Sequence, residues 1–285
     1  MEPSTTALKL RVSLAKQSDR PLIARLCLRA VGKSDYVPRR LPTIITRGTL
    51  FLAWEANTLV GMTNFDMCID GSGWLSAART DPDWRGRGVS TFLQRKIAAY
   101  AKRRGVGTLR LWVSSENKPS LRACRRGRFE QVCEASHIST NLRPAKPRKK
   151  VNPSFLSDEQ LLTLLNSSYV AKTRGYIGYR RHFLKATKKL LIQVRDQNEL
   201  YVSERAILLI SPPEKTFTAP QSSLTILDGP FAKSLIAAKE IARHMGAQTL
   251  RSYIPYNPYE ISVATRLRFR RTPWGKHCLV FEKKI

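Results

Sequence analysis

Short stretches of alternating or mainly apolar residues run through the first half of the chain, a pattern typical of β-strands. The predicted strands are residues 8–14, 50–55, 59–66, 74–80 and 108–113, with a last one from Phe129 onward. Apolar residues three or four positions apart predict helices instead. The predicted helices begin near Pro21 and span 90–103 and 121–126, and residues 36–40 are predicted to form a loop. This order of elements predicts an α/β (α+β) fold with a mixed sheet.

The turn after the predicted strand at 74–80 carries the clearest chemical signal. Residues 81–83 (Asp-Pro-Asp) end the strand, residues 85–88 (Arg-Gly-Arg-Gly) form a tight turn, and a helix follows. The first N–H groups of a helix have no acceptor within it, and the helix dipole is positive at that end. Glycine lets the backbone approach a ligand, and arginine adds charged donors. The pattern predicts an anion-binding turn; the alternative is an ordinary corner with surface arginines.

This turn lacks the third glycine of a dinucleotide fingerprint and the Gly-Lys-Ser/Thr of a P-loop. It resembles the pyrophosphate loop of the GNAT superfamily of acyl-CoA-dependent N-acetyltransferases, Arg/Gln-x-x-Gly-x-Gly/Ala. Arg85, Gly88 and Ser90 stand at the three defined positions, with Ser90 a departure from Gly/Ala. Asn117 followed by Arg128-Phe129 is similar to the family's Asn…Gly-Phe segment. The resemblance implies a sheet that splays apart beside acyl-CoA.

The same resemblance implies a set of cofactor contacts and a reaction. The backbone of Ala78, Arg79 and Thr80 would hydrogen-bond the pantetheine arm and the acetyl carbonyl, and Asn117 would contact the cofactor. The pyrophosphate would be held by Arg85, Gly86, Arg87, Gly88, Val89 and Ser90. The implied reaction is direct attack of an amine on the thioester of acetyl-CoA in a ternary complex. The acceptor would be an amino acid, a small amine, or a lysine or N-terminus of a protein.

Two catalytic groups common in the family do not stand at their usual places. Many members have a tyrosine that protonates the leaving thiolate where this chain has Cys124. A thiol can donate a proton, but a small buried residue with solvent as the acid is the alternative. The strand at 74–80 has no carboxylate, so the general base is unassigned. Asp66, Asp70, Glu116 or water could serve, although each carboxylate also suits a turn or surface position.

Tyr36 and Arg39 lie in the segment where the family binds its acceptor. Because arginine takes a carboxylate through two hydrogen bonds, this segment suits an acceptor that carries a carboxylate. The same residues could simply pack. Residues 35–39 and 81–89 are most similar to the vertebrate histidine N-acetyltransferase group within the superfamily.

The second half of the chain repeats residues of the first in constant order. The matching pairs are Ala101/Ala242, Gly105/Gly246, Thr108/Thr249, Leu109/Leu250, Arg110/Arg251, Asn117/Asn257, Arg128/Arg268 and Phe129/Phe269. They predict two tandem GNAT-type folds, the first at 1–142 and a second, diverged copy at 151–285. Between them, residues 143–150 form a basic, proline-containing linker, which could also contact nucleic acid or act as a nuclear address.

The second copy is predicted not to bind CoA. Its predicted strands are residues 190–194, 200–204, 206–211 and 224–228, and its predicted helix spans 231–244. Gly88 corresponds to Gly229, whereas Arg85 and Arg87 correspond to Ile226 and Asp228. An aspartate in a phosphate-binding turn repels the ligand.

The composition adds a second hypothesis about partners. Lysine and arginine outnumber aspartate and glutamate by 50 to 21, which gives a net charge of +29. Such a field favours polyanions such as nucleic acid or the ribosome, although it could be a general solubility trait. The alternative to an acetyltransferase is therefore a catalytically inactive GNAT-fold protein that binds nucleic acid through its basic surface.

Cysteine spacing and hydropathy limit the cell compartment and the kind of site. The five cysteines form no disulfide or metal-binding pattern, so no metal and a reducing, cytoplasmic location are predicted, or a nuclear one in a eukaryote. No apolar run approaches 18 residues, so no membrane span is predicted.

Overall fold

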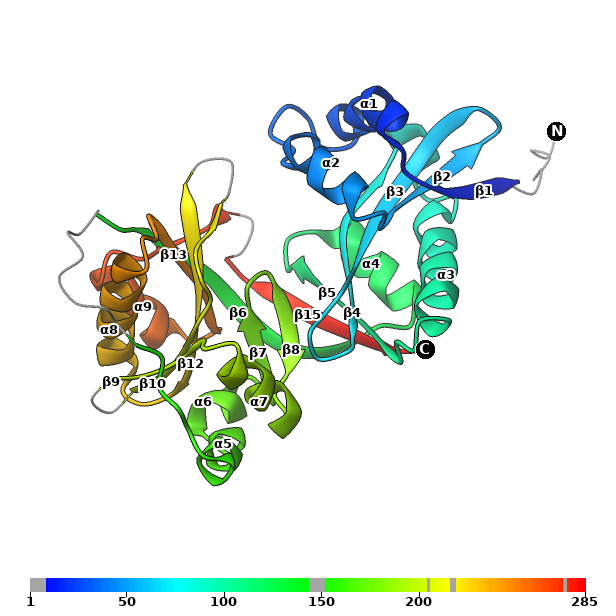
Figure 1. Cartoon of the computed structure of the whole chain (residues 1–285). Coiled ribbons are helices and arrows are strands. Elements are labelled where there is room, and N and C mark those ends of the chain that lie inside the picture. The colour runs from blue at the N-terminus through cyan, green and yellow to red at the C-terminus, as the bar shows by residue number, and fades with distance from the viewer. Residues whose placement is uncertain (1–8, 144–151, 204–205, 216–218, 274–275) are drawn as a thin grey trace. The chain divides into compact units, whose positions relative to one another are not determined.

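The computed structural model of the 285-residue chain describes residues 9–143, 152–203, 206–215, 219–273 and 276–285 (Figure 1). The chain divides into two compact units that interleave in sequence. The first contains Met1–Arg110, Arg122–Phe129 and Lys283–Ile285, and the second contains Leu111–Leu121 and Glu130–Glu282. Apart from Arg143, the predicted linker lies outside the described residues. Within the described residues, no helix is both long and apolar enough to span a bilayer.

The first unit is a sheet with helices, and the predicted mixed α/β architecture is confirmed. Its sheet order is β1-β2-β3-β4-β5, in which only β4 and β5 are parallel. The strands are β1 (Leu10–Leu14), β2 (Leu50–Glu55), β3 (Thr58–Met67), β4 (Gly73–Thr80) and β5 (Thr108–Ser114), which continues into the second unit. The helices are α1 (Arg20–Ala30), α2 (Val37–Thr46), α3 (Val89–Lys102) and α4 (Lys118–Arg126), whose first turn belongs to the second unit.

The prediction of a loop at 36–40 is wrong, because α2 begins there at Val37. Pro38 lies in the first turn of α2. An N–H in the first turn has no acceptor within the helix, so the missing N–H of proline breaks no helical hydrogen bond. The residues buried along α2 follow helical spacing: Val37, Leu41, Ile44 and Ile45. They join a core that includes Ile23 and Cys27 of α1. Tertiary packing of this apolar stripe thus stabilises a helix that two prolines had obscured in the sequence.

The second unit contains the other strands and helices of the chain. Its sheet runs from the end of β5 in the order β15-β6-β13-β12-β10-β9, and β14 pairs with β6. The strands are β6 (Glu130–Asn141), β7 (Tyr176–Tyr179), β8 (His182–Lys185), β9 (Leu200–Ser203), β10 (Ala206–Ile210), β11 (Glu214–Lys215), β12 (Pro220–Asp228), β13 (Thr249–Pro255), β14 (Arg270–Arg271) and β15 (Cys278–Lys284). The helices are α5 (Asp158–Leu165), α6 (Ser168–Lys172), α7 (Lys188–Asp196), α8 (Phe231–His244) and α9 (Pro258–Arg266).

One predicted strand of this half is wrong, since residues 190–194 lie inside α7. The side chain of Thr187 accepts a hydrogen bond from the N–H of Leu190 and caps the helix. Leu190, Leu191 and Val194 are its buried residues. Their spacing fits one face of a helix, but the run of apolar residues around them also suits a strand.

The matching residue pairs occupy equivalent places in the two halves. In each half a helix of 14 residues, α3 or α8, lies between two parallel strands. Gly105 and Gly246 follow these helices with φ angles of +75° and +84°. Asn117 Oδ1 accepts from the N–H of Ser120 in the first turn of α4, and Asn257 Oδ1 accepts from the N–H of Glu260 in the first turn of α9. The repeated residues therefore end or cap the same kinds of element.

Candidate functional site

Strand β4 has one edge without a strand partner over most of its length. On one side it pairs with β3 from Gly73 to Thr80. On the other side it pairs with β5 only at Gly73 and Trp74. Ala77 has a φ of +53°, which is uncommon for a residue with a side chain, and Ala78 is exposed. Among the described residues, the free edge of residues 75–80 therefore offers backbone donors and acceptors to a ligand.

The turn after β4 is fixed at its start by charged hydrogen bonds. Nε and Nη2 of Arg29 donate to the two carboxylate oxygens of Asp81 at 2.7 and 3.0 Å. Nη2 also donates to Asp83 at 2.8 Å, and Asp81 accepts from the N–H of Asp83 at 3.1 Å. The hydrogen bonds from Arg29 lower the pKa of Asp81. Asp81 is thus ionised at neutral pH and holds α1 to the turn.

Two glycines with positive φ form the tip of the turn. Gly86 and Gly88 have φ angles of +80° and +82°, and Gly88 is the N-cap of α3. A Cβ built on either glycine would meet no described atom within 4 Å. The first N–H to bond back into the helix is that of Phe92, which donates to Gly88 O at 2.9 Å. The N–H groups of Val89 and Ser90 therefore have no acceptor within α3.

Close packing against β3 sets the position of this helix start. A Cβ on Gly61 would lie 2.5 Å from Cγ1 of Val89 and 3.2 Å from the carbonyl oxygen of Arg79. Val89 itself is only 1% exposed. The absence of a side chain at Gly61 thus lets the first turn of α3 lie directly on the sheet, beside the end of β4.

The side chains of the two arginines in the turn bind within the protein. Nη2 of Arg85 donates to the carbonyl oxygen of Ala30 at 2.9 Å, at the end of α1. The guanidinium of Arg87 lies over the ring of Trp84, 5.1 Å from its centroid. Both residues are exposed. The side chains therefore brace the turn, and its backbone presents the anion-binding groups.

A second ion pair connects β4 with the segment before α2. Nε and Nη2 of Arg79 donate to Asp35 at 2.7 and 2.8 Å, and the two side chains are 14% and 1% exposed. Burial alone would raise the pKa of Asp35, but hydrogen bonds from Arg79 and the N–H of Val37 hold it below its ordinary value. The guanidinium of Arg79 also lies 5.6 Å from the ring centroid of Tyr36. Tyr36 is thus tied to the predicted cofactor strand.

Arg39, in contrast, is exposed and has no ion pair among the described residues. It stands in the first turn of α2, three residues after the half-exposed Tyr36. Its guanidinium is therefore available to a solvent-borne carboxylate. Neither Arg29 nor Asp35 had been selected from the sequence, because their partners lie 52 and 44 residues away.

Cys124 is buried in α4 with 2% exposure. Burial raises the pKa of its thiol to about 12. A thiol with this pKa gives up its proton less readily than an ordinary cysteine. The corresponding position of the second half is Ala264, which is 1% exposed. The residue aligned with Cys124 in the second half thus has only a methyl side chain.

The three candidate bases have different surroundings. The Asp70 carboxylate is 6% exposed and pairs with Arg110 at 2.5 Å. Burial would raise its pKa, but hydrogen bonds from Ser72 and Arg110 keep it low. Asp66 accepts from Asn64 Nδ2 at 2.7 Å, while Glu116 lies exposed in the second unit. Asn117, the other predicted contact in that unit, is also exposed.

The equivalent turn of the second half is shorter than the turn after β4. Strand β12 ends at Asp228 and α8 begins at Phe231, so only Gly229 and Pro230 connect them. Gly229 keeps a positive φ, +105°, but the N-cap Pro230 has no N–H. Ile226 is fully buried at the position that corresponds to Arg85.

The parallel strands of the second half also separate less. β12 pairs with β13 over residues 221–224, and beyond that point β7 lies against both strands. Thr225 Oγ1 donates to the carbonyl oxygen of Gly178 on β7. A Cβ on Gly178 would lie 2.6 Å from Cβ of Tyr253 on β13. The β7–β8 hairpin thus packs on side chains of both strands where they separate.

Part of the first half is similar to a known protein family. Residues 25–127 match the acetyltransferase (GNAT) family model. The match contains β4, the glycine turn and α3. An uncharacterised N-acetyltransferase of Methanocaldococcus jannaschii is 47% identical over 51 residues, which are 18% of this chain. These residues span 23% of that relative's length. Both matches are likenesses of part of the chain to N-acetyltransferases or their family model.

Solved structures match the fold of nearly the whole chain. A GCN5-related N-acetyltransferase of Sphaerobacter thermophilus aligns with a TM-score of 0.58 at 13% identity, over 96% of this chain and 95% of that one. A structure from Thermoplasma acidophilum, assigned as an acetyltransferase, aligns with a TM-score of 0.56 at 19% identity, over 93% and 89%. At such identities the likeness establishes the GNAT fold alone. In the described residues, no group of His, Cys, Asp or Glu has the arrangement of a metal site.

Proposed function

We propose that the first half of the chain binds acetyl-CoA and transfers its acetyl group to an amine. The observation that carries the proposal is the adjacency of two backbone surfaces, one without a strand partner and one without helical acceptors, in one βα unit. These are the free edge of β4 at residues 75–80 and the N-terminus of α3 behind Gly86 and Gly88. An acyl-CoA carries an extended amide-containing arm and a pyrophosphate, and the two surfaces suit these groups in turn.

The assignment of residues follows from this arrangement. Backbone groups of Ala78, Arg79 and Thr80 would hydrogen-bond the pantetheine arm and donate to the acetyl carbonyl as negative charge develops on it. The N–H groups from Gly86 to Ser90 would bind the pyrophosphate, assisted by the dipole of α3. We keep Asn117 in the proposal as a further residue that would contact the cofactor. Acetyl-CoA acts here as a co-substrate and supplies the activated acetyl group.

We place the acceptor beside Tyr36 and Arg39. The Asp35–Arg79 pair ties Tyr36 to β4, and Arg39 is an exposed cation that can bind a carboxylate through two hydrogen bonds. An amino acid or a related small amine with a carboxylate fits these groups. The resemblance of residues 35–39 and 81–89 to the histidine N-acetyltransferase group agrees with this acceptor class.

The proton transfers are assigned to solvent or to Asp66 rather than to Cys124 or Asp70. Cys124 is buried with a pKa of about 12, and Asp70 is held in a buried ion pair with Arg110. Solvent reaching the free edge of β4 can take the amine proton and return one to the leaving thiolate.

We further propose that the second half is a tandem GNAT copy without a cofactor. It keeps the parallel strands, the 14-residue helix and the positive φ of Gly229. It has Asp228 beside that glycine, and the β7–β8 hairpin packs on the side chain of Thr225 nearby. An acidic turn without the N–H of a residue at the N-cap disfavours a pyrophosphate.

A matched pair of glycine variants tests the proposal. Gly88→Asp places a carboxylate and a strained φ at the proposed pyrophosphate turn, and Gly229→Asp does the same at the equivalent turn of the second half. Release of the CoA thiol is measured with a panel of amino acids and small amines. We expect at least roughly 100-fold loss of kcat/KM in Gly88→Asp and near-normal activity in Gly229→Asp. Equal losses in both variants, or no turnover by the wild type with any amine, would contradict it.

A further inference from the structure

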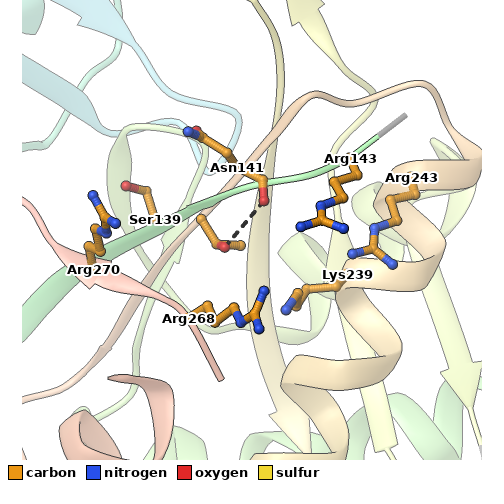
Figure 2. A pocket seen from close by; sticks show the side chains of 8 residues that line it. Ser139, Asn141, Arg143, Lys239, Arg243, Arg268 and Arg270 are labelled. Carbon is orange, nitrogen blue, oxygen red and sulfur yellow. Dashed lines mark hydrogen bonds between the residues drawn. The ribbon is translucent and has the colours of Figure 1, made fainter. Parts of the chain in front are cut away.

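The second unit contains a pocket that is unrelated to the proposed acyl-CoA turn. Its volume is about 550 Å³, and it is lined by Ser139, Thr140, Asn141, Arg143, Lys239, Arg243, Arg268 and Arg270 (Figure 2). Five of these eight residues are cationic and none is acidic. The volume falls within the range of roughly 300–1,000 Å³ common for small-ligand sites. The composition of the wall indicates an anion.

The cations of this pocket come from separate elements and meet in one space. Arg143 follows β6, Lys239 and Arg243 lie one turn apart on α8, and Arg268 and Arg270 flank the start of β14. In Figure 2 the charged ends of Arg143, Lys239, Arg243 and Arg268 gather in the same space. Lys239 and Arg243 belong to the last half of α8, away from the end that would correspond to a CoA turn.

Among the described residues, these charges have no protein counter-charge. None of the five residues forms an ion pair with a carboxylate in the part of the chain that the structure describes. Lys239 donates to the carbonyl oxygen of Leu267 at 3.1 Å, and Nε of Arg243 is buried without a hydrogen-bond partner among the described residues. Burial, Arg243 and Arg268 together lower the pKa of Lys239. Gathering like charges and leaving a buried donor unpaired both cost free energy, and a bound anion offsets both.

Part of the cluster is specific to the second half. With the matched residues aligned, Arg243 and Arg268 correspond to Lys102 and Arg128, which are also cations. Lys239 and Arg270 instead correspond to Ala98 and Glu130. Two of these cations therefore occur in the second half alone, and the first half has an acidic residue at one of the two positions.

We propose that this pocket binds an anion with several phosphate groups. Guanidinium groups pair with phosphate oxygens through two hydrogen bonds, and several phosphates in a row match cations that approach from different elements. Ser139 and Asn141 add a neutral hydroxyl and a neutral amide to the lining. No tryptophan or tyrosine is among the lining residues, so the recognition is of phosphate rather than of a stacked base. The ligand is either a small polyphosphate or the backbone of a nucleic acid.

Binding is measured on the full-length protein with two probes, inorganic tripolyphosphate by calorimetry and a fluorescent 20-nucleotide single-stranded RNA by anisotropy. The test variants are the double substitution Lys239→Gln/Arg243→Gln and the single substitution Arg270→Gln. The control is Arg95→Gln/Lys102→Gln, which removes the same charge from exposed positions of α3. Thermal unfolding without ligand verifies that all variants are folded. Arg270 is exposed, so its variant keeps the test valid if the double substitution unfolds.

We expect each removed cation of the pocket to weaken binding roughly tenfold, while the control changes affinity less than about twofold. The slope of log affinity against log salt should fall by about one for each removed cation. Loss of tripolyphosphate binding alone identifies a small polyphosphate as the ligand, and loss of RNA binding, alone or with tripolyphosphate, identifies a nucleic-acid backbone. Equal weakening in the control variant, or no binding of either probe by the wild type at low salt, would overturn the proposal.

Discussion

The turns after β4 and β12 both connect a strand to a 14-residue helix, but they differ in length and in charge. After β4, residues 81–88 form an extended turn that arginine and aspartate brace on both sides. After β12, only Gly229 and Pro230 separate the strand from α8. A glycine with positive φ persists in both turns, so it is a requirement of the corner itself. The additional residues and the open strand edge are what distinguish a binding turn from a connecting one.

Among substitutions that compare the two units, we expect the largest loss in the free energy of unfolding at the buried Asp35–Arg79 ion pair beside β4. Asp35→Asn leaves Arg79, whose side chain is 14% exposed, without its carboxylate. Losing one partner of a buried pair costs about 3 kcal/mol in the free energy of unfolding. Asp158→Asn in the second unit is the control, because Asp158 is 49% exposed and solvent screens its ion pairs, so its loss should cost far less than that of Asp35. Urea unfolding of both variants measures the difference, and similar costs would contradict the assignment of a buried pair.

The next comparison is between alanine substitutions at Gly61 and Gly178, two glycines that closely contact a neighbouring element. Gly61→Ala forces Val89 away from β3, and Gly178→Ala forces the β7 hairpin away from Tyr253. Each should destabilise the protein by about 1–3 kcal/mol through overpacking. Only Gly61→Ala should also weaken acetyl-CoA binding, since it alone shifts the start of α3. The account would be wrong if Gly178→Ala weakened binding equally at a temperature where both variants are folded.

Acid should weaken the first unit before the second. Ion pairs and hydrogen bonds lower the pKa values of Asp35, Asp70 and Asp81, so the stability they add is complete above the ordinary carboxyl value near pH 4. That stability is lost as the pH falls through the lowered values. In the second unit burial raises the pKa of Glu199, whose contribution instead decreases as the pH rises. Hydrogen exchange between pH 5 and 3 should therefore accelerate in α3 relative to α8, and the reverse order would refute this.

We expect the smallest change from substitution of Cys124, and we expect it in kcat. Cys124→Ala gives the first half the residue that the second half has at Ala264, and the space is buried in both. Because burial raises the pKa of the thiol to about 12, it should not serve as the acid. We expect kcat to change less than about twofold, with an unchanged pH profile. A large fall in kcat at unchanged KM would show that the thiol does donate a proton.

Local periodicity was enough to predict most elements of the fold. The helix predicted at 90–103 is α3, Val89–Lys102, and the one predicted at 231–244 is α8. The errors arose where a local signal was ambiguous. Pro38 and Pro42 led to the prediction of a loop where α2 begins, although a proline in the first helical turn destabilises a helix little. A short apolar run concealed α7, whose helical state depends on tertiary packing.

The candidate site was predictable only where its groups are contiguous in sequence. The glycine turn is local, so its spacing identified it. The residues that brace it, Arg29 for Asp81 and Asp35 for Arg79, lie far away in the chain and have no fixed spacing. The cationic pocket could not be predicted either, because β6, α8 and β14 bring its residues together only in the fold.

The central claim is that one half of this chain binds the cofactor and the other does not. Calorimetric titration of acetyl-CoA into the wild type and into Gly88→Asp tests it most directly. We predict saturable binding with a stoichiometry near one per chain, abolished by the substitution. A stoichiometry near two, binding that survives Gly88→Asp, or no binding at low salt would contradict the account.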